Sequence, residues 1–286
     1  MNSICRFHES NRGMGIRSGL QAGLVLLGMA VCGLAAGQDA ALKVHPELQD
    51  RWMFRLGVYS PSVDTTASLN GSGGRVGTSV NFEDDLNLAD RKTMPTFLAT
   101  ARLGERWRIE GEYFSLKRSG SRSLSKTINW GDNSYTFGTT VDSEFNSEIY
   151  RLAAGYSFLK NDREELGVVL GLHVTDFTAA IGTANLGTKK GDTLAPLPTI
   201  GLYGAYAIAP KWLLSGRVDY FSLKYSDYDG KLLNASAGVD YRFHRNFGAG
   251  LAYRYIDYDL TVTKSSYTGE INYRFSGPVL YGVASF

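Results

Sequence analysis

The chain has 286 residues, with 30 basic and 28 acidic side chains and a formal net charge of +2. This balance argues against a nucleic-acid partner, because a polyanion is bound by a basic surface. The apolar fraction of 43% is ordinary, and the apolar residues form no long runs beyond the N-terminal region. The sequence therefore does not predict a bundle of membrane-spanning helices.

Residues 1–37 have the features of a secretory signal peptide. Arg12 and Arg17 precede an apolar run that ends in small residues suited to cleavage after Gly37. A membrane anchor is the alternative, but the run is short for a spanning helix. The chain is therefore predicted to be exported, with a polar periplasmic lead-in over residues 38–50 and one domain over residues 51–286.

Both cysteines, Cys5 and Cys32, fall inside the predicted leader. The exported part would then fold without disulfide or thiol chemistry. The leader also holds three of the basic residues and one of the acidic residues, which leaves 27 of each sign in the rest of the chain.

The rest of the chain alternates apolar and polar residues with a period of two. This alternation is typical of strands that have one apolar face and one polar face. It is clearest in residues 232–258, which read as one hairpin with a turn at residues 244–246. In chain order, the pattern predicts strands at residues 52–59, 95–103, 107–113, 150–158, 166–175, 200–208, 212–220, 233–243, 247–255 and 271–286.

The connections between these strands alternate in length. Short turns follow the second, fourth, sixth and eighth strands, and longer polar loops are predicted at residues 61–92, 118–142, 183–196 and 263–269, with a turn near residues 226–230. This arrangement favours an all-β protein, a transmembrane antiparallel up-and-down barrel of about ten strands. Eight strands would result from an overcount, and twelve if residues 61–92 hide a further hairpin. A bulge at Gly277 and Pro278 is expected to shift the phase of the last strand.

Aromatic residues stand at the turn ends of the strands, with their side chains in the outward phase. They predict an aromatic girdle at one membrane interface, formed by Trp52, Trp107, Phe158, Trp212, Phe243 and Phe247.

The chain ends on Phe286 in the segment VLYGVASF, which resembles the C-terminal signature of bacterial outer-membrane proteins. Together with the leader and the strand pattern, residues 50–286 resemble small Gram-negative outer-membrane β-barrels of the OmpA-transmembrane or opacity-protein kind. The resemblance implies contact with outer-membrane lipid and lipopolysaccharide and assembly by the barrel-assembly machinery through Phe286. The even number of strands predicts both termini on one side, with the short turns, in the periplasm. A monomer is expected.

Charged residues recur in the inward phase of the strands. The predicted interior set is Arg55, Arg102, Arg108, Glu110, Glu112, Arg151, Arg217, Asp219, Asp240, Arg242, Arg254 and Arg274. A narrow barrel should pair these charges across its interior, because an unpaired buried charge costs several kcal/mol. The favoured interpretation is a plugged barrel with a structural or surface-interaction role, and the alternative is a narrow channel for small solutes lined by the same residues.

A barrel enzyme that hydrolyses lipids or peptides is the third hypothesis. His173, near Thr175 and Asp176, is the one histidine within a predicted strand, but the segment HVTD lacks the His-x-Ser pairing that lipid A deacylases use. The sequence also has no clear match to the paired acids and His-Asp dyad of omptin proteases, so catalysis is not expected.

The acidic residues Glu83, Asp84 and Asp85 lie close together in the first predicted loop. They have the chemistry to bind divalent cations, but solvated loop charges are the commoner explanation of such a cluster. No metal site or cofactor is predicted.

Overall fold

A computed structural model describes residues 43–183, 187–225, 228–264 and 267–286. Ten antiparallel strands close into one ring, which confirms the predicted fold class and strand number. The ring runs in the order β1 (Trp52–Tyr59), β4 (Met94–Leu103), β5 (Trp107–Ser123), β8 (Thr140–Lys160), β9 (Glu164–Thr183), β10 (Gly187–Ala209), β11 (Trp212–Tyr225), β12 (Tyr228–Arg242), β13 (Phe247–Thr263) and β14 (Thr268–Ser285), and β14 pairs back with β1. The predicted leader at residues 1–37 lies outside the described residues.

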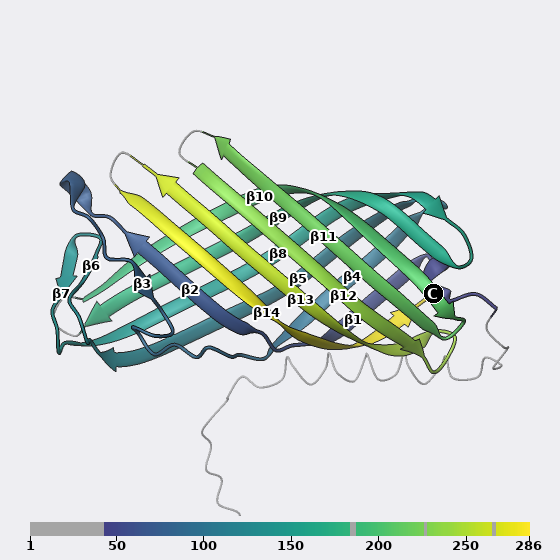
Figure 1. Cartoon of the computed structure of the whole chain (residues 1–286), viewed down its shortest axis with the longest axis horizontal. Coiled ribbons are helices and arrows are strands. Elements are labelled where there is room, and N and C mark those ends of the chain that lie inside the picture. Colours follow the sequence, from purple (N-terminus) through teal and green to yellow (C-terminus); the bar gives the residue numbers. More distant parts are fainter. Residues whose placement is uncertain (1–42, 184–186, 226–227, 265–266) are drawn as a thin grey trace, which may run out of the picture. The chain divides into compact units, whose positions relative to one another are not determined.

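Both ends of the barrel domain lie at the end with the short turns (Figure 1). Trp52 and Phe286 exchange two backbone hydrogen bonds of 2.9 Å, so the first and last strands start and finish together. Among the described residues, no helix is long and apolar enough to cross a membrane.

Several strands extend far beyond their predicted ends. β5 continues to Ser123, β8 already begins at Thr140, and β10 begins at Gly187. The loops predicted at residues 118–142 and 183–196 are therefore largely strand, and this correction lengthens the barrel well past the apolar band described next.

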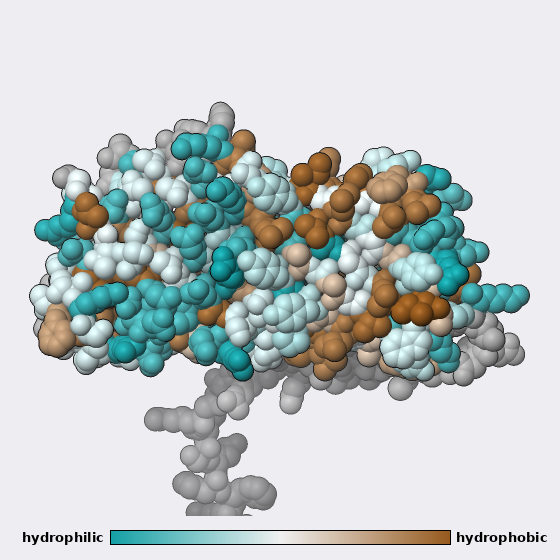
Figure 2. Space-filling view, viewed as in Figure 1, coloured by the Kyte–Doolittle hydropathy of each residue, from teal (hydrophilic) through white to brown (hydrophobic). Residues whose placement is uncertain are grey.

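The outer surface changes character along the strands. On β8, Tyr150, Leu152 and Phe158 face outward and are about half exposed, whereas the outward positions Asp142, Glu144 and Glu148 are charged. Figure 2 shows the same change, with most hydrophobic residues over the half that carries the C-terminus and polar residues over the opposite half. We call these the membrane half and the distal half of the barrel.

The inner surface changes in the opposite sense. Inward positions of the membrane half carry charges such as Arg151, whereas those of the distal half are buried and mostly apolar. The buried distal side chains include Phe114, Leu116, Phe145, Ile149, Phe177, Ile181, Leu197, Leu232, Ile256, Tyr258, Leu260, Tyr273 and Phe275. The distal half thus has the apolar core and polar exterior of a water-soluble barrel.

This inversion corrects the prediction for β14. Tyr273 and Phe275 are buried inside the barrel, and Arg274, which was predicted to lie inside, is on the outer face, where it pairs with Asp257 at 3.0 Å. The pairing of β14 with β13 is continuous, so the predicted bulge at Gly277 and Pro278 is wrong. The phase is constant, and what changes at the boundary is which face is apolar.

A glycine is required at position 277 for a reason other than a bulge. β14 pairs with β1 on one side of residues 60–61 and with β2 (Ser62–Leu69) on the other, in a constant register. A Cβ atom at Gly277 would lie 2.5 Å from the Ser60 carbonyl oxygen and 2.7 Å from the Pro61 Cα atom. Only glycine lets β14 approach this interruption so closely.

Aromatic rings mark both edges of the apolar band. Trp52, Trp107, Phe158, Trp212 and Phe243 point outward near the short turns, and the partly exposed Phe247 packs edge-on against Phe286 with ring centroids 6.3 Å apart. At the other edge, tyrosines that the sequence interpretation had not grouped also point outward: Tyr113, Tyr150, Tyr220 and Tyr253. Two such rings are the usual limits of a membrane-spanning barrel.

The distal end is covered by the first connection. β3 (Val80–Asn81) adds to β2, and the small hairpin of β6 (Ile128–Trp130) and β7 (Asn133–Tyr135) lies at the same end (Figure 1). A 3-10 turn, η2 (Ser72–Gly74), lies between β2 and β3. The side chains of Phe82 and Trp130 are buried and their ring centroids are 5.9 Å apart.

The inversion predicts where an added charge is tolerated. Leu251→Arg, on the outward face of the membrane half, should destabilise the barrel folded in bilayers by about 2–4 kcal/mol. Ser119→Arg, on the exposed outer face of the distal half, is the matched control and should leave the urea midpoint almost unchanged. Equal effects of the two substitutions would contradict the assignment of the two halves.

Candidate functional site: the barrel interior

Inside the membrane half, strands from opposite walls meet in a buried cluster of ion pairs. Glu110 on β5 accepts from Arg108 and Arg151 at 2.7 Å each and also pairs with Arg217 from β11. Arg217 in turn donates to Asp219 at 2.7 and 2.9 Å. Glu110 and Asp219 are 3% and 0% exposed, so three arginines compensate two carboxylates with almost no help from water.

A third carboxylate extends this cluster toward the distal half. Glu112 on β5 pairs with Arg254 from β13, and the second contact of this bidentate pair measures 3.1 Å. The Nε atom of Arg254 donates to the Asn234 side chain at 3.0 Å. Arg151 lies 3.6 Å from Glu112 and 3.4 Å from Asp219, so it joins the two parts into one network.

A further set of pairs lies nearer to the short turns. Arg102 on β4 makes a bidentate pair with Glu165 on β9, at 2.8 and 2.5 Å. Ser157 donates to the same carboxylate at 2.5 Å and lies 2.8 Å from the Tyr203 hydroxyl. The ring of Tyr203 stacks under the Arg108 guanidinium, 3.2 Å from the ring centroid, and so links this set to the central cluster.

The lead-in enters the mouth of the barrel. Its 3-10 turn, η1 (Pro46–Leu48), places Glu47 against Arg55 and 3.7 Å from Arg242, while the Glu47 carbonyl accepts from Arg102 at 2.9 Å. Asp240 lies 3.5 Å from Arg55. Glu47, Asp240 and Arg242 are all buried, so the lead-in supplies a charge that the strands alone leave uncompensated.

Apolar and polar contacts anchor the lead-in on both sides of Glu47. Leu48 is 1% exposed and packs with Ala207 and Leu213. Asp50 pairs with Arg245 at 2.7 Å and accepts from Ser285 at 2.5 Å. Burial lowers the pKa of His45 to about 4, so its ring is neutral at neutral pH and can accept the Glu47 amide at 3.3 Å.

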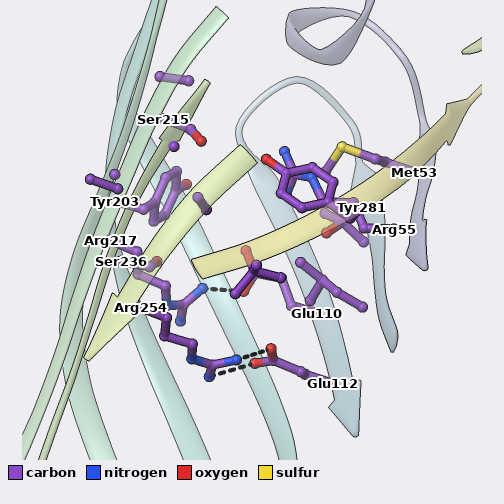
Figure 3. A pocket seen from close by; sticks show the side chains of 18 of the residues that line it. Met53, Arg55, Glu110, Glu112, Tyr203, Ser215, Arg217, Ser236, Arg254 and Tyr281 are labelled. Carbon is purple, nitrogen blue, oxygen red and sulfur yellow. Dashed lines mark hydrogen bonds and ion pairs between the residues drawn. The ribbon is translucent and has the colours of Figure 1, made fainter. Parts of the chain in front are cut away.

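A small cavity of about 150 Å³ lies among these charges (Figure 3). In this view Arg217 reaches Glu110, Arg254 reaches Glu112, and Tyr281 lies beside Arg55 and Met53. Toward the distal half, the apolar core described above follows directly, and Tyr59, Phe114 and Phe275 are 0–1% exposed. Over the described residues, the cavity is therefore closed by the lead-in at one end and by aromatic packing at the other.

The candidate catalytic residues are not gathered together. His173 is buried, with its Nδ1 atom 3.4 Å from the Thr199 hydroxyl, whereas Asp176 is exposed on the outer face of β9. Thr175 lies 3.1 Å from the Tyr258 hydroxyl. The segment HVTD therefore divides between the two faces of its strand.

The acidic residues of the first loop hold that loop to the barrel. Glu83 pairs with Arg118 and accepts from the Thr65 amide at 2.8 Å, and Asp85 pairs with Lys126 at 2.7 Å. The Asp84 carbonyl accepts from Arg122. In the part of the chain that the structure describes, no three His, Cys, Asp or Glu side chains are grouped as metal ligands.

All of the predicted interior charges except Arg274 lie inside the barrel. The sequence interpretation missed Glu47 and Asp50, which lie in the lead-in, and Glu165, which was assigned to a turn. Glu165 shares its parity with the inward positions Gly167 and Val169, so the alternation of β9 already contained the signal. Glu47 had no such signal, because the lead-in has no strand period.

Known proteins resemble this chain in structure only at low sequence identity. No protein-family model matches the chain, and no curated protein matches its sequence. Among solved structures, the outer membrane protease OmpT from Escherichia coli aligns with a TM-score of 0.49 and 12% identity, over 82% of this chain and 97% of that chain. The outer membrane protein OprG from Pseudomonas aeruginosa aligns with a TM-score of 0.40 and 10% identity, over 83% and 96% of the two chains. Neisserial surface protein A aligns with a TM-score of 0.31 and 14% identity, over 82% and 97%.

The central cluster predicts a large cost when its shared carboxylate is removed. Glu110→Gln keeps the shape of the side chain but leaves Arg108, Arg151 and Arg217 with too little negative charge, so the free energy of unfolding should fall by about 3–5 kcal/mol. Urea titration of the protein in vesicles measures this change.

The matched control removes the same charge from an exposed pair. Glu148 pairs with Lys117 at 2.7 Å on the outer face of the distal half, and Glu148→Gln should have a much smaller effect. If both substitutions moved the urea midpoint equally, the interior network would not be a main source of stability.

Proposed function

We propose that this protein is a monomeric barrel of the outer membrane that is closed to solutes and acts at the cell surface, in a structural or binding role without catalysis. The observation that carries the proposal is the continuous filling of the interior. The lead-in, the ion-pair network and the apolar distal core follow one another along the axis, and an aqueous pore needs a continuous polar path.

The proposed orientation places the termini and short turns in the periplasm. The distal half then rises above the outer leaflet and presents its polar exterior, the first connection and the hairpin of β6 and β7 to the surroundings. Rigid barrels commonly carry recognition on such outer segments. Lipid and lipopolysaccharide would contact the apolar band and its two aromatic girdles.

Biogenesis would follow the route of other outer-membrane barrels. We propose that a signal peptide within residues 1–37 directs export and is removed. The barrel-assembly machinery would then recognise the C-terminal strand through Phe286, which is 42% exposed.

A narrow solute path is the second candidate. The cavity of about 150 Å³ favours it, because arginine and glutamate side chains line it and could select ions if the lead-in left the mouth. Passage would also require the distal aromatic core to open.

Conductance in planar bilayers separates the two candidates. The refolded chain without its leader should give no discrete openings, while a known porin in the same bilayer gives steady steps. Heat-modifiable migration on gels verifies that the silent protein is folded. Discrete openings whose ion preference changes on neutralising Arg217 and Asp240 would overturn the closed-barrel proposal.

A further inference from the structure

The barrel wall has an open seam between β10 and β11. Their pairing ends at Ile200 and Tyr220. Beyond this point β10 continues to Gly187 paired with β9, and β11 continues to Tyr225 paired with β12. The two strands therefore run on as edges that face each other without a ladder between them.

The sequence of β10 accounts for the open edge. Pro196 and Pro198 lie in the segment that has lost its pairing with β11. Proline has no N–H to donate to a neighbouring strand and is confined to edges or bulges within sheets. The two prolines thus prevent a regular ladder where the seam begins.

A second gap in the wall shows how this protein fills such a space with its own chain. β2 pairs with β14 on one edge, while the distal part of β5 pairs with β8, and residues 80–91 bridge the space between β2 and β5. These residues contribute Val80, Phe82, Leu86 and Leu88, which are 0–4% exposed. That gap is sealed by apolar side chains.

The seam between β10 and β11 instead contains an apolar cavity of about 200 Å³. Its lining includes Leu197, Pro198, Phe221, Leu223, Gly230 and Leu260. Leu223 has the inward phase of β11, yet it is 50% exposed. The apolar interior of the distal half is thus accessible from the side at this point.

The surface leading to this cavity is continuous with the lipid-facing band. Leu194 and Ile200 on the outer face of β10 are 58% and 62% exposed, and the exposed Pro196 and Pro198 lie between them. The cross-strand partner of Leu194 on β9 is the exposed Asp176, so the apolar surface rises higher on β10 than on its neighbour. Hydrocarbon that covers the band can reach the cavity without crossing a polar surface.

Basic side chains stand beside the same seam. Lys224 on β11 borders the seam and also lies 3.5 Å from the Asp229 carboxylate, and Lys231 on β12 lies one strand farther away. Both lysines are exposed and have the outward phase of their strands, so the group carries a net positive charge. Positive charge at the edge of an apolar band is suited to the phosphate groups of membrane lipids.

From these observations we propose that the seam between β10 and β11 is a binding site for a membrane lipid. One acyl chain occupies the cavity between Leu197, Leu223 and Leu260, and the phosphate group lies toward Lys224 and Lys231. The lipid completes the wall here as residues 80–91 complete it beside β2. This site does not depend on whether the barrel conducts solutes.

Retention of lipid by the intact barrel tests the proposal. The full barrel with its lead-in is refolded into vesicles of phosphatidylethanolamine and phosphatidylglycerol, extracted in mild detergent and weighed by native mass spectrometry. The wild-type protein should retain a bound phospholipid. A protein without retained phospholipid, or one that holds only detergent, would overturn the proposal.

Filling the cavity should abolish this retention. A Cβ atom at Gly230 would lie 3.4–3.5 Å from Leu197, Leu260 and Phe221, so Gly230→Leu fits there and extends into the cavity. Gly111→Leu is the matched control, because a Cβ atom at Gly111, in the outward phase of β5, has no heavy atom within 4 Å. We expect Gly230→Leu to lose most of the bound lipid and Gly111→Leu to keep it, and equal retention would contradict the assigned site.

A second variant keeps the test decisive if Gly230→Leu does not fold. Leu223→Asp changes a half-exposed side chain at the opening of the cavity and places a negative charge where the acyl chain enters. It should also lose the lipid while keeping heat-modifiable migration, and undiminished retention would again overturn the proposal.

Discussion

A strand that passes from hydrocarbon into water must exchange the faces on which it carries apolar and polar side chains. In hydrocarbon the outer face has to be apolar, and every polar group must be satisfied within the protein. In water the outer face is best polar, and burial of the inner face can supply the hydrophobic stabilisation of an ordinary core. β8 satisfies both conditions in one unbroken strand, with Arg151 inside and Leu152 outside at one end and Phe145 inside and Glu144 outside at the other.

The two kinds of interior have different consequences. The membrane half places arginines and carboxylates close together, and these groups are stable only while each charge keeps its partners. That requirement explains why the lead-in enters the mouth, since Glu47 compensates Arg55 and Arg242. The distal half has one buried cation of this kind, Arg118, which Glu83 compensates. Otherwise its aromatic rings pack against one another, as Phe145 and Tyr273 do with centroids 5.1 Å apart. The ion-pair network of the membrane half and the aromatic packing of the distal half together close the interior.

The sequence predicted the membrane half well. The period of two, the short turns and the aromatic residues at the strand ends identified ten strands, because each of these features is local. The distal half was misinterpreted because the same alternation was assumed to keep the same outward face, which put Arg274 inside and required a bulge at Gly277. The sign of the alternation depends on the solvent that each segment meets, and that depends on its height in the assembled barrel.

Residues whose role depends on partners distant in the sequence were also beyond prediction. Glu47 reaches Arg242 across 195 positions of the chain, and Glu110 reaches Arg217 across more than 100. The charges themselves were visible in the sequence, but their pairing required the register and closure of the ring. The open seam likewise depends on where β10 loses its neighbour, although its two prolines could have marked β10 as an edge.

The inversion of the two faces is tested most directly by measuring whether successive outward positions of β8 contact water or lipid. Single cysteines replace residues 142, 144, 146, 148, 150, 152, 154 and 158 in a chain that lacks the leader cysteines, and each is exposed in vesicles to a water-soluble thiol reagent. We expect ready labelling at residues 142–148 and strong protection at residues 150–158, with the change at the tyrosine girdle. Protection along the whole strand would place the distal half in lipid and contradict the inversion on which the closed interior depends.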